Sequence, residues 1–388
     1  MMTETPMFLT NSDISGLIDW RHELHRHPEL SGQEVETARR VVARLQALQP
    51  DKIITDLGGH GVAAIFSGAE PGPTVLLRAE LDALPIHELS GAAHSSTIPG
   101  KGHLCGHDGH MATLMAVATG LSRQRPKRGR VVLLFQPAEE DGSGAAKVIA
   151  DPQFAEIAPD LSFSLHNFPG IPLGTVALAA GPVNCASRGM RLVLKGKTAH
   201  ASMPESGVSP MQAVAALMPA LTELGHGTPQ DDDFAMATVT HARMGEAAFG
   251  IAPGEAEIWA TLRTLRDATM DALCARAEAL AREAAARFQL GLEIAYADIF
   301  LNCENSPVAV ERLARALDAE NIRHDAGPLP MRGSEDFGRF GKHAPAAMFF
   351  LGAGERHPQL HNPDYDFPDA LMEVGARVFM RVVREVMG

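Results

Sequence analysis

The pattern of apolar and polar positions along the chain alternates between two kinds of segment. Four apolar runs, at residues 74–81, 131–135, 161–165 and 346–351, are too short for helices and continuous enough for strands that are buried on both faces. Helical stretches such as residues 111–121 separate several of them. Buried strands that alternate with helices predict an α/β fold with a mostly parallel sheet.

A helix is expected over residues 31–50, near the start of the chain. Ser31 and Glu34 have the spacing of a capping box, and Pro50 ends the pattern. The positions between them place Val35, Ala38, Val42 and Leu45 on one face.

The middle of the chain has a different order of elements. A strand at residues 188–195 precedes a helix that opens at Ser209 and Pro210. Two further strands, a long helix capped by Asp267 and a last strand follow, at residues 234–244, 255–265, 267–288 and 292–299. The order β-α-β-β-α-β is that of a ferredoxin-like domain. We therefore expect a domain at residues 186–298, inserted between two parts of a first domain, 1–185 and 299–388.

Composition and charge narrow the range of partners. The 388 residues carry 34 Lys and Arg against 47 Asp and Glu, a net charge of −13, which argues against nucleic acid as the main partner. No apolar run reaches the roughly 18 to 20 residues of a membrane span, and the first residues lack a basic region followed by an apolar one. Four scattered cysteines make no disulfide framework. We expect a cytoplasmic protein that acts on a small molecule, without a membrane or nucleic-acid partner.

Cys105 and His107 form the strongest local signal for chemistry. In an extended segment, residues two apart point the same way, so this pair could present a thiolate and an imidazole to one metal ion. The glycines beside them allow a tight turn. The alternative is an ordinary core cysteine beside a surface histidine.

Acidic residues and histidines also follow the predicted strands. Glu139 and Glu140 come after the run 131–135, at the carboxyl end of a strand, where open α/β sheets place their sites. His166, His361 and Asp82 come after the other three runs. Each of these residues alone fits a solvated loop, but four strand ends at one edge of a sheet favour a common site.

The candidate ligands are Cys105, His107, Glu140, His166 and His361. A set of five exceeds what one tetrahedral zinc ion uses, and two metal ions with shared ligands fit it better. Such a pair lowers the pKa of bound water from 15.7 toward roughly 7. Glu139 is then the expected general base, with Asp82 as a second catalytic residue.

Several longer motifs, spread over the whole chain, contain these residues. They are His25-Arg26-His27-Pro28-Glu29, Arg78-Ala79-Glu80-Leu81-Asp82-Ala83-Leu84-Pro85, Cys105-Gly106-His107-Asp108-Gly109-His110, Gln136-Pro137-Ala138-Glu139-Glu140, His166-Asn167, Gly333-Ser334-Glu335-Asp336-Phe337 and His361-Asn362-Pro363-Asp364-Tyr365-Asp366-Phe367. In these motifs and their order, the chain resembles the amidohydrolase branch of the M20 metallopeptidase family, which includes hippurate hydrolase, N-acyl-amino-acid deacylases and indole-acetyl-amino-acid hydrolases.

The resemblance implies the same five ligands and the same base. It also implies an aminopeptidase-like catalytic domain that carries a ferredoxin-like lid, in homodimers or homotetramers. Three positions depart from the family pattern: Glu80 stands in place of Asp, Glu205 in place of His and Gly250 in place of Asn.

Two residues of the expected lid are candidates for contact with the substrate. His200 matches a histidine that reaches the substrate in the family. Arg263 is either a ligand of a substrate carboxylate or an ordinary surface cation.

His103 and His357 match no ligand position, and we expect both at the surface. The remaining cysteines, Cys185, Cys274 and Cys303, are expected to be small buried apolar residues.

The sequence thus predicts a dinuclear amidohydrolase that cleaves N-acyl amino acids or related small amides. Zinc or manganese is the expected metal, with cobalt and nickel as alternatives. Three other functions stay open: a dipeptidase or aminopeptidase of the same superfamily, a thiol hydrolase with Cys105 as nucleophile and His107 as base, and a non-catalytic metal-binding protein.

Overall fold

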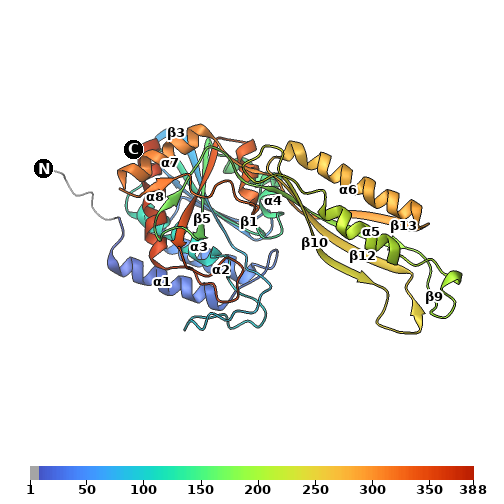
Figure 1. The fold of residues 1–388 in the computed structure, drawn as a ribbon. Helices are drawn as coiled ribbons and strands as arrows, with labels where there is room; N and C mark the ends of the chain where they lie inside the picture. The colour runs from blue at the N-terminus through green and yellow to red at the C-terminus, as the bar shows by residue number, and fades with distance from the viewer. Residues whose placement is uncertain (1–7) are drawn as a thin grey trace. The chain divides into compact units, whose positions relative to one another are not determined.

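A mixed sheet of eight strands forms the centre of one part of the protein (Figure 1). Its order is β1-β2-β4-β3-β5-β16-β6-β15, and the inner strands β4, β3, β5 and β16 pair in parallel. The strands are β1 (Lys52–Leu57), β2 (Gly61–Ser67), β3 (Glu70–Glu80), β4 (Arg128–Gln136), β5 (Leu161–Pro169), β6 (Val176–Ala177), β15 (His324–Asp325) and β16 (Ala346–Gly354). The prediction of an α/β fold with a mostly parallel sheet is confirmed.

The four apolar runs form these four inner strands. Leu133, Leu77, Phe163 and Ala347 stand side by side across them in register. None of the four is more than 1% exposed, which explains why the runs lack the alternation of a half-buried strand.

Helices cover this sheet. They are α1 (Asn11–Arg26), α2 (Val35–Ala47), α3 (His107–Arg123), α4 (Gly144–Ala150), α7 (Pro307–Ala319) and α8 (Ala370–Met387), with short 3-10 helices at η1 (Pro152–Glu156) and η3 (Asp336–Lys342). Helix α3 is buried from His107 to Leu121 and packs against α1 and α8. Its first turn is therefore held in the interior of the unit.

The expected capping box at Ser31 and Glu34 is wrong. Helix α2 begins at Val35, and the side chain of Glu34 makes no capping hydrogen bond. The Ser31 hydroxyl instead donates to Oδ2 of Asp82 at 2.7 Å, and Oε1 of Glu34 accepts the backbone N–H of Ala138 at 2.8 Å. Buried partners from distant segments thus replace the local pair that the spacing suggested.

A second unit comprises residues 182–303 and 330–335. Its main elements are β8 (Ala186–Lys195), α5 (Met211–Thr222), β10 (Ala235–Met244), β12 (Glu255–Thr264), α6 (Asp267–Arg287) and β13 (Gly291–Phe300). The strands form an antiparallel sheet of order β10-β12-β8-β13, and α5 and α6 share its apolar core. The minor elements are β9 (Ala199–His200), η2 (Pro204–Ser206) and β11 (Ile251–Ala252), while β7 (Gly181–Asn184) and β14 (Cys303–Asn305) contain the points at which the chain passes from one unit to the other.

The helix starts of this unit differ slightly from expectation. Pro210, rather than Ser209, is the N-cap of α5, and Arg266 is the N-cap of α6. Asp267 is the first helical residue, and its carboxylate accepts the backbone N–H of Asn302 at 2.7 Å.

This computed structural model describes residues 8–388, so the opening residues considered above lie outside it. The first unit takes in residues up to 181, 304–329 and 336–388. Within the described residues, none of the helices combines the length and the apolar character needed to cross a membrane.

Candidate metal centre

The four inner strands bring acidic residues and histidines to one edge of the sheet. Asp82 comes just after β3, and Glu139 and Glu140 follow β4. His361 lies in the loop after β16. His166 lies inside β5, which extends to Pro169, because this strand is longer than its apolar run. The expected meeting of strand ends is therefore present, although one member sits within its strand.

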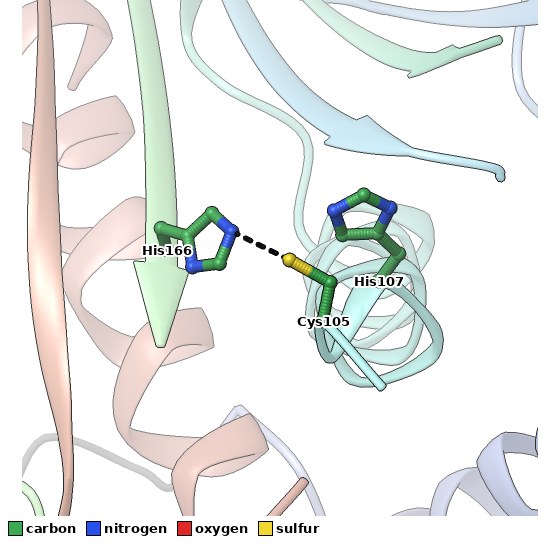
Figure 2. Close-up of side chains that lie close together, drawn as sticks. All are labelled: Cys105, His107 and His166. Carbon is green, nitrogen blue, oxygen red and sulfur yellow. Dashed lines mark hydrogen bonds between the residues drawn. The ribbon is translucent and has the colours of Figure 1, made fainter. Parts of the chain in front are cut away.

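Cys105 and His107 are not part of an extended segment, contrary to expectation. Gly106 between them is left-handed, with φ of 92°, and His107 begins helix α3. A Cβ atom at Gly106 would lie 2.3 Å from Oδ1 of Asn167. This turn directs the Cys105 sulfur toward His166 of β5, with 3.5 Å between Sγ and Nε2 (Figure 2). Only glycine fits both the backbone conformation and the space.

The five candidate ligands form two groups that share Cys105. One group is Cys105, His107 and His166, and the other is Cys105, Glu140 and His361; within each, the donor atoms lie within 4.8 Å of one another. Nε2 of His107 is 3.8 Å from Oε1 of Glu140, and Nε2 of His361 is 3.6 Å from Oε2 of the same carboxylate. Glu139 forms a third group with His107 and Glu140. The structure thus brings together all five residues and the candidate base.

Backbone contacts orient the histidine rings. Nδ1 of His107 lies 2.9 Å from the carbonyl oxygen of Asp82, and Nδ1 of His166 lies 2.7 Å from the carbonyl oxygen of Asn167. A carbonyl only accepts, so each Nδ1 carries a proton, and Nε2 is the ring nitrogen that remains to bind a metal ion. His361 is left-handed, with φ of 66°, and its backbone N–H donates to the carbonyl of Leu104 at 2.8 Å.

Two buried donor atoms without a hydrogen bond indicate that this donor set fits metal ions. Within residues 8–388, Nε2 of His107 and Oε1 of Glu140 are buried and make no hydrogen bond. Burying such groups without a hydrogen bond is unfavourable, and a cation bound by both would remove that penalty. Thiolate, imidazole and carboxylate donors together suit divalent transition metals.

The electrostatics of the cluster also favour a cation. Burial, reinforced by the charges of Glu140 and Glu139, raises the pKa of the Cys105 thiol well above its ordinary value. Burial would lower the pKa of His107, but Asp82 and the charges of Glu80 and Glu140 raise it to about 10. A bound cation acts in the opposite sense on the thiol, because it stabilises the thiolate.

Glu80, one of the departures from the family pattern, is buried next to His107 of the cluster. Its buried carboxylate pairs with Arg78 and lies 2.6 Å from Nδ1 of His110. Nε2 of His110 is 2.5 Å from Oδ1 of Asn167, whose amide nitrogen donates to the Tyr365 hydroxyl at 2.5 Å. The motifs contain His110, Asn167 and Tyr365, but nothing in their spacing indicated this buried chain of contacts.

His103 is buried, so the expectation of a surface histidine is wrong. It is 1% exposed, and neither ring nitrogen has a hydrogen-bond partner within residues 8–388. Burial lowers its pKa to about 4, so the ring is neutral. His357 is partly buried, with Nε2 2.7 Å from the carbonyl oxygen of Asp366. Cys185, Cys274 and Cys303 are buried, as expected.

The expected substrate-binding residues belong to the second unit. Exposed His200 lies in β9 beside Ile251, and its Nδ1 accepts the backbone N–H of Ser202 at 3.1 Å. Arg263 of β12 donates to the carbonyl of Arg332 at 3.0 Å and to the Ser334 hydroxyl at 2.8 Å. Among the described residues Arg263 has no acidic partner.

The departures Glu205 and Gly250 also lie in this unit. The carbonyl of Gly250 accepts the N–H of Ala201 at 3.0 Å, so this position adjoins His200. Glu205 is exposed in η2.

Known proteins resemble this chain along most of its length. Two N-acetylcysteine deacetylases of Bacillus subtilis are 29% and 32% identical to the chain, over 94% and 90% of it and 94% and 83% of their own lengths. The crystal structure of the YxeP protein of Bacillus subtilis, described as a dinuclear metal-binding peptidase of the M20 family, superposes with a TM-score of 0.80 at 26% identity, over 97% of this chain and 99% of that one. The model of peptidase family M20/M25/M40 matches residues 76–385. The chain therefore belongs to peptidase family M20/M25/M40, as its motifs predicted.

Proposed function

We propose that the protein is a metal-dependent amidohydrolase that cleaves the amide bond of N-acyl amino acids. The observation that carries this proposal is the pair of three-donor groups that share Cys105, with Glu139 beside them. The names of the relatives support it, since two of them are deacetylases of an N-acetylated amino acid.

Cys105, His107, Glu140, His166 and His361 would hold two divalent ions per subunit, zinc or manganese with cobalt and nickel as alternatives. Such ions, when bound, polarise the substrate carbonyl and lower the pKa of water. The chain's own part is to fix the donors. Asp82 does so twice: its carbonyl orients His107, and its Oδ2 accepts the N–H of Glu140 at 3.0 Å.

Glu139 is the proposed general base. It is 6% exposed and lies within the group formed with His107 and Glu140. Its carboxylate takes a proton from the attacking water as the water oxygen bonds to the carbonyl carbon. The same proton then passes to the amide nitrogen as the carbon–nitrogen bond breaks, which releases a carboxylic acid and the amine of the amino acid.

The second unit would contribute contacts to the substrate. Because Nδ1 of His200 accepts a hydrogen bond, Nε2 carries the proton and can donate it to the developing oxyanion. Arg263, with no acidic partner among residues 8–388, is suited to a substrate carboxylate. We propose that residues 186–298 act as a lid, and that the enzyme works in the cytoplasm as a homodimer or homotetramer.

The rival functions have less support. A thiol hydrolase needs a cysteine with a lowered pKa, whereas the surroundings of Cys105 raise its pKa. Nε2 of His166, not the proposed His107, is the nitrogen that lies 3.5 Å from the sulfur. A non-catalytic metal-binding protein has no use for the buried carboxylate of Glu139 beside the ligands. An aminopeptidase would require an acid that holds a free substrate amine.

The decisive test is turnover with defined metal content. Zinc-, manganese- and cobalt-loaded enzyme is given N-acetyl, N-benzoyl and aryl-acetyl amino acids, with free dipeptides as the competing class. We expect hydrolysis of the acylated substrates, its loss with EDTA, and its return with added metal. Circular dichroism should stay native throughout, because the core is large enough to fold without metal. Hydrolysis that resists EDTA would favour the thiol mechanism, and preference for free dipeptides would favour the peptidase.

A further inference from the structure

The carboxylate of Glu34 is completely buried just before helix α2. Its Oε1 accepts two backbone N–H groups, from Gly32 at 2.9 Å and from Ala138 at 2.8 Å. Its Oε2 has no hydrogen-bond partner within the described part of the chain. Burial of a carboxylate is unfavourable unless hydrogen bonds offset its loss of contact with water. The backbone N–H groups of Gly32 and Ala138 supply these hydrogen bonds.

What Glu34 contacts is the residue before the proposed base. Ala138 is left-handed, with φ of 51°, a conformation that is unfavourable for a residue with a side chain. Its carbonyl accepts the N–H of Gly144 at 2.8 Å, and the carbonyl of Glu139 accepts the N–H of Gly142 at 2.8 Å. The turn therefore has a strained backbone that its hydrogen bonds must hold in place.

Residues 31–34 also hold the backbone that follows Glu139. The Ser31 hydroxyl donates to Oδ2 of Asp82 at 2.7 Å, and this oxygen accepts the N–H of Glu140 at 3.0 Å. The backbone is thus held before Glu139 by Glu34 directly, and after it by Ser31 through Asp82.

We infer that Glu34 is a positioning residue for catalysis, whose buried acceptor oxygen holds the backbone at Ala138 and thereby aims the carboxylate of Glu139. This inference rests on the proposed role of Glu139 and adds a residue outside the metal ligands. The physical reason is that proton transfer depends steeply on geometry, so that a displacement of about 1 Å can reduce the rate about 100-fold.

A purely structural role at the start of α2 is the alternative, and Glu29 offers a matched control. Its Oε2 accepts the backbone N–H of Thr37 at 2.8 Å and the Thr37 hydroxyl at 2.9 Å. Glu29 therefore stabilises the first turn of α2 through a similar pair of hydrogen bonds, and within residues 8–388 no hydrogen bond joins its side chain to residues 137–140.

The kinetic test compares Glu34→Ala, Glu34→Gln and Glu29→Ala with the parent enzyme, all loaded with the same metal. We expect Glu34→Ala to lower kcat about 10- to 100-fold, with KM and metal content unchanged. Glu34→Gln should keep a kcat close to that of the parent, because its amide oxygen still accepts both N–H groups. Glu29→Ala should lose stability without losing kcat. The inference is overturned if Glu34→Ala and Glu29→Ala have the same kcat, or if Glu34→Gln is as slow as Glu34→Ala.

Hydrogen exchange supplies a readout that does not depend on turnover. Peptides that cover residues 136–143 should exchange faster in Glu34→Ala than in the parent, and at the parental rate in Glu29→Ala. Should Glu34→Ala fail to fold, Glu34→Asp withdraws the acceptor by one methylene and gives the same comparison. If the parent hydrolyses no amide, the proposed function fails, whereas unchanged exchange at residues 136–143 overturns the role of Glu34.

Discussion

The main-chain carbonyl of Asp82 accepts the Nδ1–H of His107 at 2.9 Å, which leaves Nε2, 3.8 Å from Oε1 of Glu140, as the ring nitrogen that can bind a metal ion. The contact uses the backbone of Asp82, so it survives replacement of the side chain. The carboxylate has a separate task, because its Oδ2 accepts the N–H of Glu140.

Asp82→Ala should therefore weaken metal binding without preventing it. Loss of an outer hydrogen bond to a ligand typically costs 10- to 100-fold in metal affinity. Titration against a competing chelator would measure the change. Asp82→Asn serves as the control, since its amide oxygen can still accept the N–H of Glu140; unchanged affinity in Asp82→Ala would show that the carboxylate does not support the site.

Glu139 and Glu140 should behave differently although they are neighbours. Glu139→Gln should keep the metal content of the parent and lose about 10²- to 10⁴-fold in kcat, because it removes the group proposed to carry the proton. Glu140→Ala should lose metal instead. Elemental analysis and kinetics on the same samples separate the two effects, and equal metal content with equal activity in both variants would remove the pair from the site.

Cys105 should make the enzyme sensitive to oxidation. A metal-bound thiolate reacts with peroxide, and the oxidised sulfur is a poor ligand, so metal and activity should be lost together. Cys105→Ala should likewise bind less metal, whereas alanine at buried Cys274 should leave metal content unchanged. Full metal content and turnover in Cys105→Ala would contradict its assignment as a ligand.

Stability should fall between neutral and alkaline pH because of His25. Burial would lower the pKa of this ring, but Asp108 and Glu88, 2.8 and 3.1 Å from its nitrogens, raise the pKa to about 9. The folded state then holds one proton more than the unfolded state between pH 6.5 and about 9, so the free energy of unfolding decreases with pH in that window. The free energy of unfolding should decrease by about 3 kcal/mol in total across this window.

Urea unfolding of the parent and of His25→Gln, from pH 6 to pH 10, tests this. The parent should lose stability more steeply than the variant, by up to about 1.4 kcal/mol per pH unit. Parallel curves for the two proteins would show that His25 is not protonated in the folded state.

The site was predictable from the sequence where the ligands follow continuous apolar runs. Glu140 and His361 come after strands buried on both faces, and parallel pairing of those strands brings their ends to one edge. Ser31 and Glu34 were misassigned because the capping-box spacing is a local pattern. Their partners Asp82 and Ala138 lie far along the chain, just after strands β3 and β4. His103 was misplaced for the same reason: its burial depends on tertiary packing, which the spacing of residues does not encode.

The turn at Gly106 shows a further limit. The glycine was recognised as permissive, but the sequence did not indicate that Asn167 would occupy the space of its missing side chain. Conformational freedom can be assigned from residue type, whereas close approach requires the structure.

The pairing of β5 with β16 has a consequence for biosynthesis. Ser162 pairs with Ala346, and the whole second unit is translated between these two strands. A nascent chain that has not reached β16 carries Cys105, His107, Glu140 and His166 but lacks His361, and its β5 edge is unpaired. The full set of five proposed ligands therefore exists only after synthesis has passed the whole second unit and reached His361.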